Sequence, residues 1–281
     1  MAEPVTLTPP NKPPVVLAIA AFDPSAGAGV LADIKTMSAF GCYGIGVVTS
    51  LTIQNTQRVF GASHQSGDMI KNQLEPLFAD FAITAIKTGM LPTAQVVEEV
   101  AGAISSNFVP HIVIDPVIRS TSGYDLIDED ALAALVERLF PFASVVTPNW
   151  EESERITGIA VRDGASAEQA ARAILALGPR AVLIKGGDVD GDTATDVLVD
   201  AADTVSYQVP KVQSRNTHGT GCAMASALAC LLARGSTLRE AVPIAKEYIR
   251  RAIQSAPGLG SGNGPLNHFP PEWDSNATAG R

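Results

Sequence analysis

The chain contains few of the features that mark a secreted or membrane-bound protein. Its 281 residues include only three cysteines, Cys42, Cys222 and Cys230, which form neither a disulfide framework nor a metal-binding spacing. No apolar run approaches the roughly 18 residues needed to cross a bilayer. Residues 1–14 are rich in proline and lack a secretory signal pattern. We therefore expect a cytoplasmic protein that does not act at a membrane.

The chain also lacks an excess of positive charge and two common catalytic motifs. Its formal net charge of −9 argues against nucleic acid as a partner. A nucleotide ligand stays possible, because backbone amides can bind phosphate within an acidic protein. The Walker loop of ordinary P-loop kinases is absent. The four histidines are too scattered for a zinc motif, and we expect each on the surface or in the core: His64, His111, His218 and His268.

One dinucleotide-binding fingerprint is incomplete. Gly27–Ala32 matches the pattern G-x-G-x-x-A after a predicted strand, which is typical of NAD- and FAD-dependent oxidoreductases. Those enzymes also need an acidic residue about 20 positions further on to hold the ribose. No acidic residue occurs between Ile34 and Gly67. The oxidoreductase remains an alternative and is not the preferred interpretation.

Apolar runs typical of buried strands alternate with helical segments along most of the chain. This alternation predicts one α/β domain over residues 15–269, with a mainly parallel sheet covered on both faces and flexible tails at 1–14 and 270–281. The predicted strands are Val15–Ala21, Ile45–Ile53, Thr84–Lys87, His111–Asp115, Ser144–Thr147, Ala181–Lys185, Asp196–Val199 and Thr204–Val209.

Helix boundaries follow from capping residues. Helices are expected after Ser66 and Asp128, and capping boxes are predicted at Ser166 and Thr237. Pro243 predicts either a late start or a kink in the last helix. Residues 258–264 are rich in glycine and are expected to form a flexible loop.

Polar residues follow most of the predicted strands. Because ligands collect at the carboxyl ends of parallel strands, these residues predict a site at one edge of the sheet, although any single one could be a turn or a helix cap. The polar strand ends are Asp23, Gln54–Thr56, Lys87–Gly89, Asp115–Pro116, Thr147–Asn149 and Lys185–Gly187.

A glycine-containing loop precedes an apolar helical run, and the chain is organised around it. The loop is Asn216–Cys222, and Gly235 ends the run that follows. The first amides of such a helix lack carbonyl partners and can bind a phosphate. Cys222 lies in the first turn, where the helix dipole favours the thiolate, although an isolated cysteine is more often an inert buried side chain.

Taken together, these motifs resemble the hydroxymethylpyrimidine/phosphomethylpyrimidine kinase branch of the ribokinase-like superfamily. The resemblance implies a three-layer α/β/α sandwich and extends from about Val15 to Phe269. It rests on Asp23–Gly29, Ala32–Thr36, Gln54–Thr56, Lys87–Leu91, Asp115–Val117, Thr147–Glu152, Lys185–Gly187, Asn216–Cys222 and Gly264–Phe269.

The resemblance also implies a role for individual residues in an ATP- and Mg²⁺-dependent kinase. Cys222 would be the catalytic base, and an anion hole would be formed by Gly219, Thr220, Gly221 and Cys222. The pyrimidine acceptor would contact Asp33, Gln54, Met90, Val117 and Ala21. ATP would be bound by Lys185, Asn149 and Lys246, and the metal by Glu152 and Asp115. The acceptor would be 4-amino-5-hydroxymethyl-2-methylpyrimidine and then its monophosphate, and the enzyme would be a homodimer.

Two departures from the family pattern concern the turn after the first strand. Relatives carry Gly-Ser/Thr-Asp where this chain has Ala21-Phe22-Asp23, and a double glycine where it has Ala26-Gly27. If Ala21 and Phe22 line the acceptor pocket, they fill space that is open in relatives. A pyridoxal or pyridoxine kinase of the same fold is therefore the nearest alternative, and a non-catalytic ligand-binding relative is a more distant one.

Overall fold

A mixed β-sheet forms the centre of the molecule. The structure, a computed structural model, describes residues 12–120, 123–187 and 191–273. Within these residues the sheet has nine strands in the order β3-β2-β1-β4-β5-β6-β7-β8-β9. The strands are β1 Val15–Phe22, β2 Tyr43–Gln54, β3 Val59–His64, β4 Ile83–Thr88, β5 His111–Ile114, β6 Val145–Val146, β7 Ala181–Ile184, β8 Thr193–Asp200 and β9 Thr204–Pro210.

Strand direction confirms the predicted mainly parallel sheet. Strands β2, β1, β4, β5, β6 and β7 pair in parallel, so their carboxyl ends meet at one edge. Strands β3, β8 and β9 are antiparallel additions at the two sides. All eight predicted strands are present, with ends displaced by at most three residues, and β3 is a strand that the sequence analysis missed.

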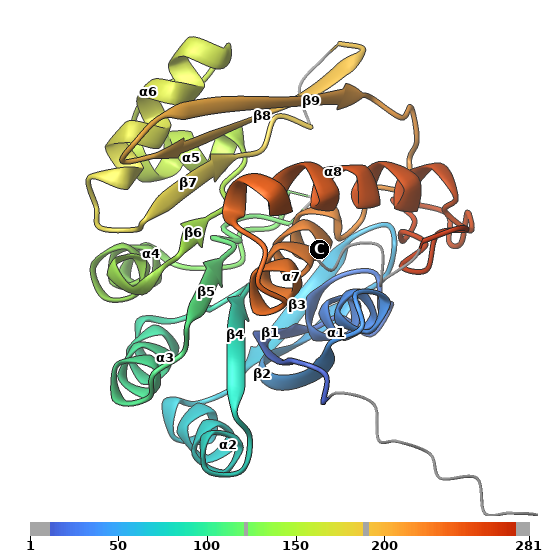
Figure 1. Ribbon diagram of the computed structural model, residues 1–281. Helices are drawn as coiled ribbons and strands as arrows, with labels where there is room; N and C mark the ends of the chain where they lie inside the picture. The colour runs from blue at the N-terminus through green and yellow to red at the C-terminus, as the bar shows by residue number, and fades with distance from the viewer. Residues whose placement is uncertain (1–11, 121–122, 188–190, 274–281) are drawn as a thin grey trace, which may run out of the picture.

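Helices cover both faces of the sheet (Figure 1). One layer consists of α1 Gly29–Ala39, α7 Thr220–Ala233 and α8 Leu238–Gln254. The other contains α2 Gly67–Asp80, α3 Ala94–Ser106, α4 Glu129–Ala134 with its extensions η1 Leu135–Leu139 and η2 Phe140–Phe142, α5 Trp150–Thr157 and α6 Gly164–Leu175. The predicted three-layer α/β/α sandwich is confirmed.

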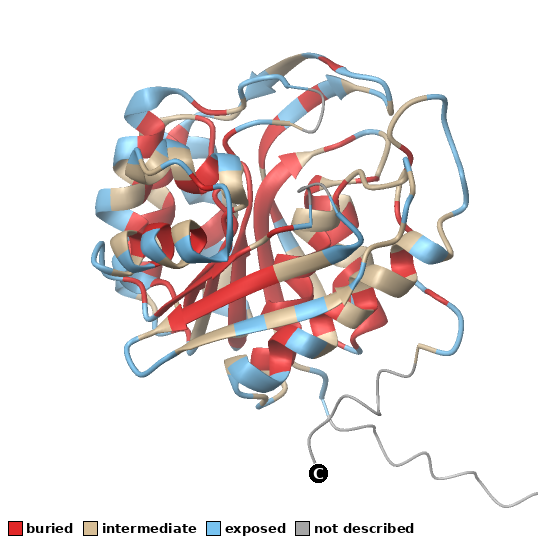
Figure 2. Cartoon of the chain, turned by 90° about the horizontal axis from the view of Figure 1, so that it is seen from above, coloured by how far each residue is buried: buried red, intermediate tan, exposed pale blue. Residues whose placement is uncertain are grey.

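The apolar pattern of β1 shows why both faces must be covered. Successive side chains of a strand point to opposite faces. Leu17 and Ile19 join the core under α2 and α3, whereas Val16 and Ala18 join the core under α1, α7 and α8. All four are fully buried, and the central strands are buried along their length in Figure 2.

One predicted helix start needs correction, and the late start that was one of the two effects predicted for Pro243 is not found. The cap of α6 is Asp163, whose carboxylate accepts a hydrogen bond from the Ser166 amide, so Ser166 is the third residue of the helix and not its cap. Helix α8 begins as its Thr237 capping box predicts, and Pro243 does not delay it. Pro243 removes the amide that would bond the Arg239 carbonyl, and the Tyr207 hydroxyl donates to that carbonyl instead at 3.2 Å.

The C-terminal segment is also more ordered than expected. The Gly262 amide donates a hydrogen bond to the Thr56 hydroxyl at 3.2 Å, and the Ser261 hydroxyl accepts one from the Gln57 side-chain amide at 2.9 Å. The 258–264 loop therefore packs on the β2–β3 turn. Trp273 lies in the predicted tail, yet its ring packs 5.1 Å from that of Phe40. The remainder of both predicted tails, 1–11 and 274–281, lies outside the described residues.

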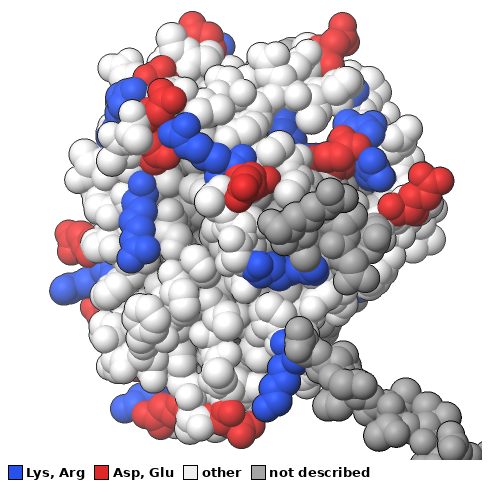
Figure 3. Space-filling model, in the orientation of Figure 1, with Lys and Arg blue, Asp and Glu red and all other residues white. Residues whose placement is uncertain are grey.

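The described helices include none long and apolar enough to cross a membrane. On the face shown in Figure 3, acidic and basic side chains are interspersed and do not gather into a surface of one sign. Further charged side chains line a cavity at the carboxyl edge of the sheet.

Candidate active site

A cavity of about 930 Å³ opens at the carboxyl ends of the parallel strands. Its walls combine the ends of β1, β2, β5 and β7 with the starts of α1, α5 and α7, and with parts of β9 and α8. Most of the predicted site residues line it: Ala21, Gln54, Met90, Asp115, Val117, Asn149, Glu152, Lys185, Gly219, Thr220, Gly221, Cys222 and Lys246. Five of the six predicted polar strand ends therefore contribute residues to one cavity, whereas Lys87–Gly89 does not line it.

The start of α7 has the geometry of an anion-binding site. Gly219 is the N-cap with φ +82°, and no side chain caps the helix. Glycine is required there, because a Cβ would lie 1.9 Å from the Gly27 carbonyl oxygen. The Thr220 amide donates to the Thr217 carbonyl at 3.2 Å. The next two amides, of Gly221 and Cys222, have no carbonyl partner in the helix and can bind an anion.

The Cys222 side chain is half-buried beside these amides. Burial raises its pKa, the positive charge of Lys87 lowers it, and the charges of Asp33 and Asp115 raise it, giving a pKa of about 11. The prediction that the local potential favours the thiolate is therefore wrong. The attraction of Lys87 and the hydrogen bond from the Gly29 amide are together smaller than the cost of burying the charge, so the sulfur holds its proton at neutral pH.

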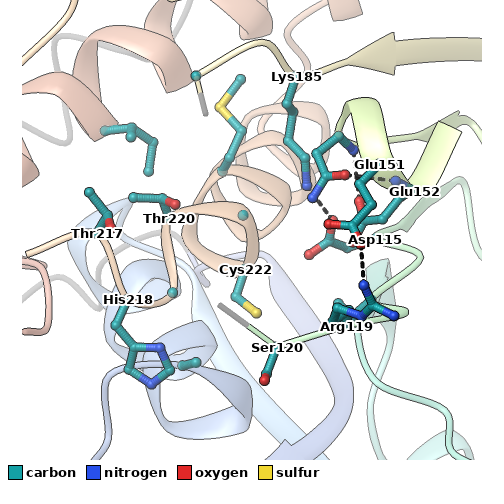
Figure 4. A pocket seen from close by; sticks show the side chains of 18 of the residues that line it. Asp115, Arg119, Ser120, Glu151, Glu152, Lys185, Thr217, His218, Thr220 and Cys222 are labelled. Atoms are coloured by element: carbon teal, nitrogen blue, oxygen red, sulfur yellow. Dashed lines mark hydrogen bonds and ion pairs between the residues drawn. The ribbon is translucent and has the colours of Figure 1, made fainter. Parts of the chain in front are cut away.

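Lys185 and Asp115 form an ion pair across the helix start, with 2.7 Å between Nζ and Oδ1. Asp115 also accepts a hydrogen bond from the Thr147 hydroxyl at 3.1 Å. Burial disfavours the ammonium charge, but Asp115 and Glu152 outweigh this and raise the pKa of Lys185. A Cβ on Gly221 would lie 3.1 Å from the Lys185 nitrogen, so the pair adjoins the anion-binding amides (Figure 4).

Asn149 and Glu152 also have a structural role, which the sequence analysis did not assign. Asn149 accepts a bond from the Glu152 amide at 2.8 Å, and Glu152 accepts one from the Asn149 amide at 2.7 Å. These reciprocal bonds form the capping box of α5. Both side chains also line the cavity, so the cap fixes their position at its wall.

Two predicted ligand-binding residues are engaged elsewhere. Asp33 does not line the cavity: it is fully buried, and the Lys87 ammonium bonds both its oxygens at 2.8 Å. Its contact with the acceptor stays a prediction, since the Asp33 side chain bonds Lys87 and Ser226 in the core and does not line the cavity. Lys246 does line the cavity, but its ammonium pairs with Asp196 at 2.7 Å.

Sequence reasoning missed several residues of the cavity wall, among them His218 and Arg119. His218 was expected to be surface or core, yet it lines the cavity with its Nε2 atom 2.8 Å from Oδ2 of Asp23. Figure 4 shows it on the side of the helix start opposite Asp115. Its position directly before the glycines of the loop was the signal that could have identified it. Arg119 was also missed, and it bonds Asp125 and Glu151 at the rim.

Unpaired helix-start amides, an adjacent lysine–carboxylate pair and a large cavity at the carboxyl edge of a parallel sheet define a phosphotransferase of the α/β class. The comparisons with known proteins identify the branch. A model of the phosphomethylpyrimidine kinase family matches residues 23–267, so the chain belongs to that family. It is accordingly an enzyme that transfers phosphoryl groups.

Individual relatives agree with this assignment. The hydroxymethylpyrimidine/phosphomethylpyrimidine kinase of Streptomyces coelicolor is 43% identical over 261 residues, which cover 93% of this chain and 96% of that protein. The thiamine biosynthesis bifunctional protein ThiED of Geobacter sulfurreducens is 44% identical over 254 residues, covering 90% of this chain. The chain spans 52% of that longer protein.

Solved structures confirm the ribokinase-like fold. Pyridoxal kinase from Staphylococcus aureus, in complex with AMP-PCP and pyridoxal, superposes with a TM-score of 0.85 at 29% identity, over 92% of this chain and 95% of that one. Phosphomethylpyrimidine kinase from Clostridium difficile has a TM-score of 0.76 at 38% identity, over 85% and 99%.

Proposed function

We propose that the chain transfers the γ-phosphoryl group of ATP to 4-amino-5-hydroxymethyl-2-methylpyrimidine and then to the resulting monophosphate, in thiamine biosynthesis. One observation carries the proposal. The free amides of Gly221 and Cys222 and the Lys185–Asp115 pair share a cavity with Gln54 and Met90, the residues expected to meet the acceptor. Phosphoryl donor and acceptor can therefore meet within one enclosure.

The chain's own groups would act mainly by position and charge, as phosphoryl transfer requires. The amides of Gly221 and Cys222 would hold the phosphoryl group in flight, and the Lys185 ammonium would balance its charge. Cys222 would receive the proton of the acceptor hydroxyl, a role typically worth about 10²–10⁴-fold in rate. Because the thiol holds its proton at neutral pH, this transfer needs the minor thiolate fraction or a shift on substrate binding.

The adenine end of ATP would lie between β9 and α8, where the cavity wall is largely apolar. Such a surface suits a flat aromatic base that is held by packing. The apolar part of that wall consists of Ala194, Val209, Pro210, Val212, Met224, Ile249 and Ile253, and charged side chains border it at Asp196, Lys211, Lys246 and Arg250. Asn149 and Lys246 would contact the nucleotide from the wall of the same cavity. The Lys246 ammonium would do so while paired with Asp196.

The carboxylates fit Mg²⁺ bound together with a substrate. Among the described residues no group of three histidine, cysteine or carboxylate side chains could hold a metal by itself. Mg²⁺ is usually held by one or two carboxylates, waters and substrate phosphates, and Asp115 and Glu152 supply such a pair at the cavity wall. When bound there, the ion would neutralise charge on the phosphates of ATP.

The pyridoxal alternative rests on the departure at Ala21-Phe22 and on the S. aureus neighbour. The departure at Ala21-Phe22 carries less weight, because Ala21 lines the cavity but Phe22 is not among its lining residues. Only an added methyl group therefore distinguishes this wall from the pattern of relatives. A Gln54 side chain that both donates and accepts suits the edge of an aminopyrimidine.

We also propose a homodimer. The outer strands β2 and β3 carry exposed apolar side chains at Leu51, Ile53 and Phe60, each about half exposed or more. Apolar residues gathered at a sheet edge favour association. Sedimentation should give twice the mass of the chain, and a monomer at micromolar concentration would refute the dimer.

The acceptor is tested by comparing kcat/KM for hydroxymethylpyrimidine and pyridoxal with the same ATP and Mg²⁺. We expect the pyrimidine to be the better acceptor by at least about tenfold, or about 1.4 kcal/mol. Turnover of pyridoxal alone would establish the alternative. Binding of the pyrimidine with no ATP turnover would favour a non-catalytic relative.

A further inference from the structure

A histidine–aspartate pair joins two loops that come from opposite ends of the chain. Asp23 follows β1, and His218 directly precedes the cap of α7. Their side chains meet at 2.8 Å between His218 Nε2 and Asp23 Oδ2, and both are largely buried, with 14% and 3% of their side chains exposed. Both residues line the cavity, and none of the roles proposed above uses their pairing.

The Asp23 carboxylate is fixed by several donors. It accepts bonds from the Ser25 amide at 2.8 Å, the Ser25 hydroxyl at 2.7 Å and the Ala28 amide at 2.9 Å, besides the imidazole. Burial raises its pKa, but the bonds from His218 and Ser25 outweigh this and lower it. A carboxylate only accepts, so the imidazole donates through Nε2. The orientation of Asp23 thus determines that of the His218 ring.

The backbone beside the pair has little room to move. A Cβ on Gly27 would lie 2.4 Å from Cδ2 of His218, so the imidazole rests on the Gly27 backbone. One residue further, Gly219 packs on the Gly27 carbonyl. The His218 amide donates to the Gly264 carbonyl at 3.2 Å, which holds the loop from the other side. Since no side chain caps α7, these contacts help to set where the helix starts.

We propose that His218 is a positioning residue, whose bond to Asp23 holds Gly219 and thereby aims the Gly221 and Cys222 amides at the phosphoryl group. The bond also occupies Oδ2 of Asp23 at the wall of a cavity that must accept phosphates. The proposal rests on the proposed kinase function. Both phosphorylations would use the same amides. Loss of the His218–Asp23 bond should therefore lower the rate to the same extent with both acceptors.

The test measures kcat and KM for the pyrimidine and for its monophosphate in three variants. His218→Ala should lower kcat by about 10²-fold for both acceptors, since a displacement of about 1 Å can cost that much. His218→Gln retains an N–H that can reach Asp23, and should recover at least tenfold of the loss. His64→Ala, at an exposed histidine bonded only to Ser50, is the matched control and should leave kcat unchanged.

The outcomes separate the two levels of the proposal. Inactive wild-type protein with both acceptors would overturn the kinase assignment itself. Active wild type with an unimpaired His218→Ala variant would overturn the positioning role, and so would a loss confined to the hydroxyl acceptor, which indicates proton transfer. Thermal unfolding is recorded for each variant. If His218→Ala does not fold, His218→Asn, whose shorter amide stops short of Asp23, is compared with His218→Gln in its place.

Discussion

Two lysine–aspartate pairs with nearly the same geometry occupy very different positions. The Lys87–Asp33 pair spans 2.8 Å with both side chains fully buried. The Lys185–Asp115 pair spans 2.7 Å, with 15% and 2% of its side chains exposed. The first is enclosed by α1, β4 and α7, where Ser226 completes it with a bond to Asp33 at 2.8 Å. The second lines the cavity beside Gly221.

From this difference we infer that access to the cavity, more than residue type or pairing, distinguishes a pair that serves stability from one that serves activity. When one partner is removed, a core carboxylate has no water to replace the lost bond, whereas a cavity carboxylate can be hydrated. The first pair should therefore govern stability and the second activity.

The largest effect is expected in the core pair. Lys87→Met leaves the buried Asp33 carboxyl group without its counterion and should lower the free energy of unfolding by about 3–5 kcal/mol. Adding Asp33→Leu should restore most of that loss, because apolar replacement of a whole buried pair is often neutral. Urea denaturation of the single and double variants measures both. Equal instability of the two would contradict the interpretation.

Lys185→Met should have the opposite profile. We expect kcat to fall by about 10²–10³-fold, comparable to the loss of one preorganised charge-stabilising group. Its unfolding free energy should change by less than about 1 kcal/mol, since Asp115 keeps the Thr147 bond and can be hydrated from the cavity. A destabilised variant with normal kcat would reverse the assignment of the two pairs.

Charges from both pairs, on Lys87, Asp33 and Asp115, act on Cys222. We therefore expect both stability and activity to depend on pH. Its pKa of about 11 lies above the ordinary value of about 9. The folded protein therefore holds this proton between pH 9 and 11 while the unfolded chain loses it, so this stabilising contribution falls as the pH rises through that window. The rate with the hydroxyl acceptor should rise about tenfold per pH unit if the thiolate is the active form.

Initial rates from pH 7 to 9.5, with urea midpoints for wild type and Cys222→Ser, measure these effects. The serine variant should lack the rise in rate and lose less stability in alkali. A flat profile for the wild type would exclude a thiolate that forms as a minor fraction at the pKa of about 11.

The smallest effect concerns the backbone of the turn between β1 and α1, away from both pairs. Ala26 has φ +56°, a left-handed conformation that costs an alanine about 1–2 kcal/mol. Ala26→Gly should relieve this and gain up to about 1 kcal/mol after the entropy of glycine is subtracted. Gly219→Ala is the matched control and should destabilise, because its Cβ would meet the Gly27 carbonyl. Thermal unfolding of both compares the two positions.

Much of the fold followed from local sequence patterns. Apolar runs located eight strands, and Gly219 and Gly235 marked the limits of α7. The misses arose where local patterns are ambiguous. Strand β3 contains Gly61 and three polar or small neighbours in its second half, so it lacks the pattern of a buried strand. Two overlapping capping patterns compete before α6, and only the structure shows that Asp163 is the cap.

Within the site, the errors all involve contacts between distant segments. The sequence places Asp33 near the start of α1 but cannot tell that its side chain meets Lys87, 54 residues away. His218 and Asp23 are separated by 195 residues, and no local pattern links them. Likewise, the dipole of α7 was visible in the sequence, whereas the burial that raises the pKa of Cys222 depends on the folded surroundings.

The most direct test of the account compares the two acceptors in the Cys222→Ser variant. The pyrimidine hydroxyl must lose a proton during transfer, whereas the phosphate of the monophosphate is already ionised. Single-turnover rates with each acceptor should therefore show a loss at least about tenfold greater for the hydroxyl than for the phosphate. Equal losses for both acceptors would contradict the account and leave Cys222 as a residue that only shapes the loop.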